Sequence, residues 1–124
     1  MDLNGKRILV SNCYGLGDLI TCTPALRRLK ELYPVCQVTV LANRAHLDVV
    51  RGLPYIDQVA GLVRGACLGR WRFVPRLRQQ DAVVFTDWQP QLLFLSYLLR
   101  IPLRGGVARE GRKVCRYLTH RAVD

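Results

Sequence analysis

Short apolar runs alternate along the chain with longer segments whose apolar residues recur every three to four positions. The runs favour buried strands, and the periodic segments favour helices. Strands are predicted at residues 7–10, 37–42, 58–63, 82–86 and 104–108. Helices are predicted at residues 19–33, 43–51, 70–80 and 89–100, with Pro24 near the first turn of the first helix and with Asn43 and Gly52 bounding the second. Residues 109–124 are basic and show no clear pattern.

This alternation predicts an α/β fold, in which a parallel sheet is covered by helices on both faces in the doubly wound, Rossmann-like arrangement. The 124 residues fit one domain, 1–124, and half of them are hydrophobic, which is enough to bury a core. Intrinsic disorder is therefore not expected. Ligands of such sheets bind beyond the carboxyl ends of the strands, so the loop after the first strand is the first place to look for chemistry.

That loop contains Gly15, Gly17 and Asp18. Glycine lets the backbone turn sharply and approach a ligand, and the amides of the following helix N-terminus favour an anion. A dinucleotide-binding motif would place a third glycine where Ile20 stands, so NAD binding is not indicated. Asp18 has two interpretations: it stabilises the start of the helix, or it is a general base that takes a proton from a substrate hydroxyl.

Positive charge is concentrated in the second half of the chain. The formal net charge is +10, and residues 63–124 carry twelve Lys or Arg side chains against four Asp or Glu. Eleven of these cations are arginines, whose planar guanidinium pairs well with phosphate and carboxylate. The charge predicts an anionic partner and leaves phosphorylated sugars or lipids, an anionic membrane surface and nucleic acid open, beside the alternative of a merely solvated basic surface.

Neither a membrane span nor a secretion signal is indicated by the sequence. Ser96 interrupts the longest apolar stretch, residues 92–99, and only three apolar residues follow Lys6-Arg7. A cytoplasmic protein is therefore expected. The five cysteines never form a Cys-x-x-Cys pair, so we expect reduced, buried thiols and no metal site.

Two further polar residues and the two tryptophans are candidates with alternative interpretations. Asp87, at the end of a predicted strand, either caps the next helix or contacts a ligand. Thr23 either presents a hydroxyl near the first loop or supports the helix. Trp71 and Trp88 either pack against the domain or stack on a sugar ring.

A series of motifs runs through nearly the whole chain: KRILV (6–10), GLGDLI (15–20), TPALRRLK (23–30), YP (33–34), LPYIDQV (53–59), DAVVFTD (81–87) with Gln89, and RGGV (104–107). In content and order, the series resembles the amino-terminal part of glycosyltransferase family 9. This family includes the heptosyltransferases that build the inner core of bacterial lipopolysaccharide. The chain departs from the family at Pro90 and Gln91, where a glycine and then a basic residue are often found.

The resemblance implies a GT-B enzyme, in which an amino-terminal Rossmann-like domain holds the acceptor and a carboxyl-terminal one holds the nucleotide sugar. Such enzymes invert the anomeric centre without a metal or another cofactor. The aspartate of the Gly-Asp pair acts as general base, and Asp18 occupies that position here. Complete members are more than twice as long, so we expect this chain to be the acceptor-side domain, to lack the donor domain and to be inactive alone.

The expected function is sugar transfer from a nucleotide-sugar donor to a phosphorylated glycolipid or lipopolysaccharide-core acceptor. A peripheral contact with the anionic inner face of the cytoplasmic membrane is also expected. The candidate substrate contacts are Gly15, Gly17, Thr23, Asp87, Gln89 and Arg109. The alternative is a non-enzymatic basic domain that binds nucleic acid or another anionic partner, although the sequence shows no motif for reading nucleic acid.

Overall fold

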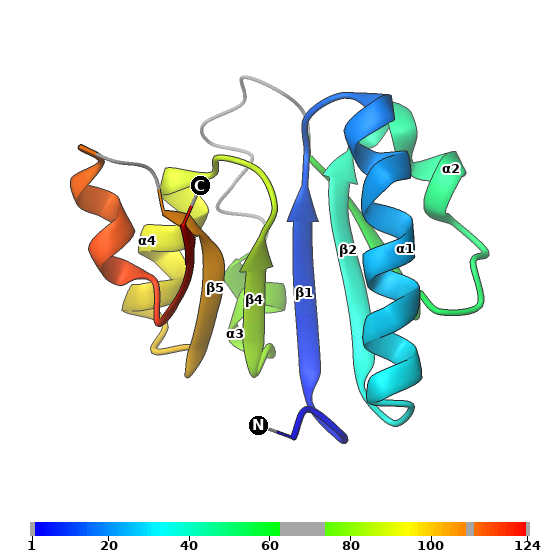
Figure 1. The fold of residues 1–124 in the computed structure, drawn as a ribbon, viewed down its shortest axis with the longest axis horizontal. Helices are drawn as coiled ribbons and strands as arrows, with labels where there is room; N and C mark the ends of the chain where they lie inside the picture. Colours follow the sequence, from blue (N-terminus) through cyan, green and yellow to red (C-terminus); the bar gives the residue numbers. More distant parts are fainter. Residues whose placement is uncertain (1, 63–73, 109–110, 124) are drawn as a thin grey trace.

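The computed structural model describes residues 2–62, 74–108 and 111–123, and its centre is a six-stranded sheet (Figure 1). The strands are β1 (Arg7–Asn12), β2 (Gln37–Asn43), β3 (Gln58–Leu62), β4 (Ala82–Phe85), β5 (Leu103–Ala108) and β6 (His120–Val123). They lie in the order β3-β2-β1-β4-β5-β6, and every neighbouring pair is parallel. This is the strand order of the Rossmann fold.

Helices cover the two faces of this sheet. They are α1 (Leu16–Leu32), η1 (Arg44–His46), α2 (Leu47–Val50), α3 (Val74–Arg78), α4 (Pro90–Leu98) and η3 (Lys113–Tyr117), where η denotes a 3-10 helix. Buried residues of α1 and α2 pack with Ile8 and Val10 of β1, whereas those of α3, α4 and η3 pack with Leu9 of the same strand. Because successive strand residues face opposite sides, β1 contributes to two separate cores.

The chain changes its direction across the sheet between β1 and β4. From β1 it runs through β2 to β3 at one edge, and then it returns to β4 and runs through β5 to β6 at the other. Crossovers between parallel strands are right-handed, so this reversal requires the helices to change face, as observed. The carboxyl ends of β1 and β4 are therefore the topological switch point, where open α/β sheets bind their ligands.

The predicted fold class and all five predicted strands are confirmed. The short helical segment predicted after β2 is confirmed as η1 and α2. Asn43 caps it as predicted, because its side chain accepts a hydrogen bond from the Ala45 N–H at 3.0 Å. Gly52, just beyond α2, has a φ of +85°, which favours glycine. The helix predicted at 70–80 corresponds to α3, and residues 70–73 lie outside the described residues.

The position predicted for Pro24 is wrong. Helix α1 begins at Leu16, directly after its N-cap Gly15, so Pro24 lies inside the helix and not in its first turn. Proline has no N–H to donate to the carbonyl four residues earlier, here that of Ile20. The Thr23 hydroxyl donates to this carbonyl at 2.7 Å and so replaces the missing partner.

The expectation of an unpatterned tail at 109–124 is also wrong for the residues that the structure describes. Helix η3 buries Cys115, and Leu118 enters the same core. Strand β6 then pairs with β5, beginning at Gly105 opposite His120. A short basic strand at a sheet edge lacks the apolar run by which buried strands are recognised in a sequence.

Three absences concern only the described part of the chain. Its helices include none that is long and apolar enough to cross a membrane. Its His, Cys, Asp and Glu residues form no group of three or more that could hold a metal ion. No disulfide joins the cysteines that the structure describes, all four of which are buried: Cys13, Cys22, Cys36 and Cys115.

Candidate functional site

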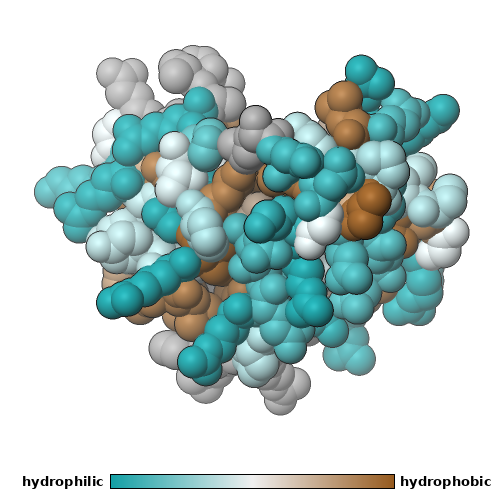
Figure 2. Space-filling view, turned by 90° about the horizontal axis from the view of Figure 1, so that it is seen from below, coloured by the Kyte–Doolittle hydropathy of each residue, from teal (hydrophilic) through white to brown (hydrophobic). Residues whose placement is uncertain are grey.

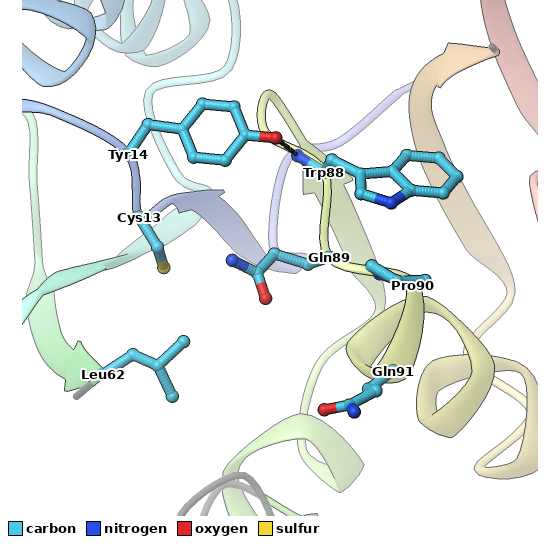
Figure 3. Close-up of a pocket in the computed structure, with 7 residues that line it drawn as sticks. All are labelled: Cys13, Tyr14, Leu62, Trp88, Gln89, Pro90 and Gln91. Carbon is cyan, nitrogen blue, oxygen red and sulfur yellow. Dashed lines mark hydrogen bonds between the residues drawn. The ribbon is translucent and has the colours of Figure 1, made fainter. Parts of the chain in front are cut away.

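A cavity of about 250 Å³ lies at the switch point, beside the carboxyl ends of β1 and β4 (Figure 3). Its walls come from the β1–α1 loop, the last residue of β3 and the start of α4. The lining residues are Cys13, Tyr14, Leu62, Trp88, Gln89, Pro90 and Gln91. Figure 3 shows the side chains of Cys13 and Gln89 projecting toward the same space, which Leu62 closes from another side.

A buried carboxylate, that of Asp87, holds the base of this cavity together. Its Oδ1 accepts a hydrogen bond from the Ser11 hydroxyl at 2.8 Å. Its Oδ2 accepts from the Cys13 N–H at 2.8 Å and from the Gln89 side-chain amide at 3.1 Å. Close by, both the N–H and the hydroxyl of Thr86 donate to the Ser11 carbonyl. Asp87 thus fixes the end of β1 to the end of β4.

These contacts change the interpretation of Asp87. The N-cap of α4 is Gln89, and the Gln89 side chain forms no capping hydrogen bond. Asp87 is therefore not the helix cap that was one of its two predicted roles. It lies beneath the cavity wall and acts through its neighbours, since Cys13 and Gln89 line the cavity while Asp87 itself does not.

A second connection crosses the mouth of the cavity between two aromatic residues. The Trp88 N–H donates to the Tyr14 hydroxyl at 2.8 Å, so the loops that leave β1 and β4 are joined at this point as well (Figure 3). The Trp88 indole is half-buried, and the Arg112 guanidinium lies over it, 5.8 Å from the ring centroid. A cation over an indole face is attracted by the ring quadrupole.

Asp18 lies on the same loop-to-helix connection, in the first turn of α1, and is exposed. Its backbone carbonyl accepts hydrogen bonds from the Thr21 hydroxyl at 2.8 Å and from the Asn12 side-chain amide at 3.3 Å. No hydrogen bond or ion pair within the described residues involves its carboxylate. The geometry therefore gives no support to a side-chain cap and leaves this carboxylate open to solvent at the carboxyl edge of the sheet.

The two glycines of this loop leave open space around Asp18. Gly15 has an extended backbone, with φ −85°, and a Cβ placed there would meet only the Asp18 carboxylate, at 3.9 Å. A Cβ at Gly17 would meet nothing within 4 Å. The fold itself thus does not demand glycine at either position, which is compatible with the predicted close approach of a ligand.

The remaining predicted substrate contacts do not all lie at the cavity. Gln89 lines the cavity, as a substrate contact would. Thr23 lies farther along α1, with its hydroxyl committed to the Ile20 carbonyl, and is not among the lining residues. Arg109 and Trp71 lie outside the described residues.

Sequence reasoning missed Ser11, Cys13 and Tyr14 as parts of the site. The Cys13 thiol donates to the Leu41 carbonyl at 3.5 Å, which fixes its side chain against β2. The available signal was position alone, because all three residues lie within four positions after the first predicted strand. Nearby in α1, Cys22 packs in the core, and burial raises the pKa of its thiol.

Comparison with solved structures identifies proteins that share this Rossmann-like fold. The chain is similar to the family 9 glycosyltransferase of Veillonella parvula DSM 2008, with a TM-score of 0.80 and 20% identity over 98% of this chain and 36% of that one. It is similar to the E. coli ADP-heptose LPS heptosyltransferase II, with a TM-score of 0.73 and 18% identity over 96% and 35% of the two chains.

A third similar structure is the E. coli heptosyltransferase WaaC with ADP, with a TM-score of 0.68 and 15% identity over 94% of this chain and 40% of that one. The chain thus spans between about a third and two fifths of the length of these glycosyltransferases. No family model matches the sequence, and no curated protein matches it significantly.

Proposed function

We propose that this chain is the acceptor-side domain of an inverting glycosyltransferase of family 9. The observation that carries the proposal is the fold likeness to the family 9 enzyme of Veillonella parvula, which extends over 98% of the chain. The family-like motifs found in the sequence support it independently, because they occur in family order. The complete enzyme would act in the cytoplasm and transfer a sugar from a nucleotide-sugar donor to a phosphorylated glycolipid.

Asp18 is the general base in this proposal. The oxygen of an acceptor hydroxyl attacks the anomeric carbon of the donor sugar, and the bond from that carbon to the nucleotide diphosphate breaks. The nucleotide diphosphate leaves with the bonding electrons, Asp18 takes the hydroxyl proton, and attack opposite the leaving group inverts the anomeric centre. The exposed Asp18 carboxylate, with open space over Gly15 and Gly17, suits this role.

The cavity between Tyr14 and Gln89 is the acceptor site in this proposal. Its volume of about 250 Å³ is slightly below the roughly 300–1000 Å³ of small-molecule pockets, so it suits one sugar unit of the acceptor. Gln89 and Gln91 offer amide groups to sugar hydroxyls, and the Trp88 indole at the rim offers an apolar face to a ring.

The test uses Asp18→Asn, which keeps the side-chain shape but removes the proton acceptor. In a polypeptide that joins this chain to a donor-binding domain, we expect kcat to fall at least a hundredfold, because a positioned base contributes about 10²- to 10⁴-fold. Acceptor affinity and melting temperature should stay unchanged. An Asp18→Asn enzyme with near-normal kcat would refute the assignment.

The 124-residue chain by itself provides a second test. We expect it to bind the acceptor without transferring sugar, since catalysis requires both substrates to be held together. Titration with a phosphorylated core oligosaccharide measures binding, and incubation with ADP-heptose measures transfer. Turnover by the isolated chain would contradict the proposed division between acceptor and donor domains.

A further inference from the structure

Gln89, at the start of α4, is held in one orientation by a carboxylate beside it. The residue is buried, with only 9% of its surface exposed, and its amide nitrogen donates to Asp87 Oδ2 at 3.1 Å. A carboxylate oxygen accepts hydrogen bonds and cannot donate them, so it has to face the nitrogen of the amide and not its oxygen. Asp87 therefore decides which end of the Gln89 amide faces the cavity.

The end that faces the cavity is the oxygen. In Figure 3 the Gln89 amide nitrogen is directed toward Cys13, whereas the oxygen is directed into the space bounded by Leu62 and Gln91. The hydrogen bond to Asp87 uses the nitrogen, and no hydrogen bond within the described residues uses the oxygen. Because an amide oxygen only accepts, a ligand in the cavity has to bring a donor to it, such as a hydroxyl group.

The charge behind this cavity is negative. The described residues that line it are all uncharged. Behind Gln89 and Cys13 lies the Asp87 carboxylate, which within the described residues accepts its hydrogen bonds from uncharged donors alone. A phosphate or carboxylate in the cavity would lie near this uncompensated like charge, and such a juxtaposition costs affinity.

We propose that the cavity selects an uncharged sugar unit through its hydroxyl groups, and that Gln89, oriented by Asp87, is the residue that makes this selection. The inference deepens the proposed function, on which the role of the cavity as acceptor site rests. A sugar hydroxyl donates to the Gln89 oxygen. An ionised phosphate or carboxylate has no proton to donate there, so it leaves a buried acceptor without a partner and also meets the charge of Asp87.

This selection divides a phosphorylated acceptor into two parts. An uncharged sugar unit enters the cavity, and the anionic groups of the acceptor stay outside it. A cation stands at the rim, where the Arg112 guanidinium lies over the Trp88 ring without lining the cavity. The basic charge of the chain and the uncharged lining of the cavity are therefore compatible with one acceptor.

A second hollow at the opposite edge of the sheet provides a contrast and a control. It has a volume of about 200 Å³, lies at the amino ends of β1, β2 and β3, and is lined by residues of both charges, among them Arg7 and Asp57. Figure 2 shows the molecule from this edge, where hydrophilic side chains predominate. Gln79 is an exposed residue of this hollow, and no hydrogen bond within the described residues fixes its side-chain amide.

The test compares pairs of ligands that differ in charge. Methyl glycosides of glucose, galactose and mannose are titrated into the 124-residue chain, beside the methyl glycosides of the corresponding uronic acids, in which a carboxylate replaces the terminal hydroxymethyl group. NMR measures these affinities, and a shift of the Trp88 indole N–H resonance locates the ligand at the cavity. We expect a neutral glycoside to bind about tenfold more tightly than its uronate partner.

Two substitutions separate the hydrogen bond from the charge. Gln89→Met keeps the length of the side chain but removes the amide, so the neutral glycoside should bind about three- to tenfold more weakly. Asp87→Asn removes the charge but keeps an oxygen for the Gln89 amide, so the uronate should gain about tenfold in affinity relative to its neutral partner. The control Gln79→Met makes the first exchange at the opposite edge and should leave both affinities unchanged.

Three results would overturn the proposal. They are a uronate that binds as tightly as its neutral partner, a lack of binding by every neutral glycoside, and a loss in Gln79→Met equal to that in Gln89→Met. Should Gln89→Met fail to fold, the ligand pairs and Asp87→Asn still decide.

The test involves no sugar transfer, so its failure is distinguishable from failure of the proposed function. A near-normal kcat in Asp18→Asn would remove the general base and leave the selection of a neutral sugar standing. Tight uronate binding, beside the expected loss of kcat in Asp18→Asn, would overturn the selection alone.

Discussion

Replacing Asp87 with alanine should destabilise the domain strongly, although Asp87 is buried and does not line the cavity. The carboxylate accepts three hydrogen bonds, from the Ser11 hydroxyl, the Cys13 N–H and the Gln89 amide. The hydroxyl and the amide can rotate toward other acceptors or water. The Cys13 N–H cannot, because its direction is fixed by the backbone at the end of β1.

The magnitude follows from this difference between donors. A hydrogen bond to a charged group contributes about 1.5–3 kcal/mol, and a buried N–H left without a partner costs about 1–3 kcal/mol. Since two of the donors can reorient, we expect Asp87→Ala to lower the free energy of unfolding by about 3 kcal/mol. Asp87→Asn keeps one oxygen for the Cys13 N–H, and its amide can donate to the Ser11 oxygen. We therefore expect this variant to lower the free energy of unfolding by only about 1 kcal/mol.

Urea unfolding followed by far-UV circular dichroism measures both values, and hydrogen exchange at the Cys13 amide locates the effect. A control is Asp48→Ala, because the Asp48 side chain is 93% exposed and its ion pair with Arg51 is worth little. If Asp87→Ala costs no more than Asp48→Ala, or if Asn costs as much as Ala, the hydrogen-bond reasoning is wrong. The Asn variant keeps the test decisive should the Ala variant fail to fold.

Two further predictions concern α1 and its contact with β2. Pro24→Ala should raise the free energy of unfolding by about 1–2 kcal/mol in a urea titration, since alanine restores an N–H donor to the Ile20 carbonyl; a loss of stability would contradict this. Burial tends to raise the pKa of Asp57, but hydrogen bonds from Lys30 and the Val38 N–H outweigh it and hold the pKa below its usual 3.8. The stability that comes from this lowered pKa is present at neutral pH and is lost as the pH falls below about 3.8. Lys30→Met should therefore make the free energy of unfolding depend less on pH on the acid side. An unchanged slope of that free energy against pH would refute the reasoning.

Most of the fold was predictable because its determinants are local. The apolar runs of β1 and β4 mark buried parallel strands, and Asn43 and Gly52 mark the ends of a short helical segment through their own backbone preferences. Position within an α/β sheet then indicates where a ligand binds. For this reason the first loop and the end of β4 were chosen correctly as neighbours of a cavity, without knowledge of any contact.

The contacts that build the site were not predictable in the same way. Tyr14 and Trp88 are 74 positions apart, and Ser11 and Asp87 are 76 apart. They meet only because β1 pairs in parallel with β4 in a register that places Ser11 opposite Phe85. Neither the strand order nor the register is encoded by residues near any one of these positions.

Two carboxylates stand at the carboxyl edge of the sheet, and their surroundings separate their roles. For Asp87 to take a substrate proton, it would have to give up hydrogen bonds that fix β1 to β4, and it lies behind residues that line the cavity. Asp18 holds no such contact within the described residues, and its neighbours Gly15 and Gly17 leave room for a substrate to approach. Neither carboxylate lines the cavity, so the difference between them is that Asp18 can take a proton without giving up a contact between β1 and β4. This difference supports the proposal that the base is Asp18 and not Asp87.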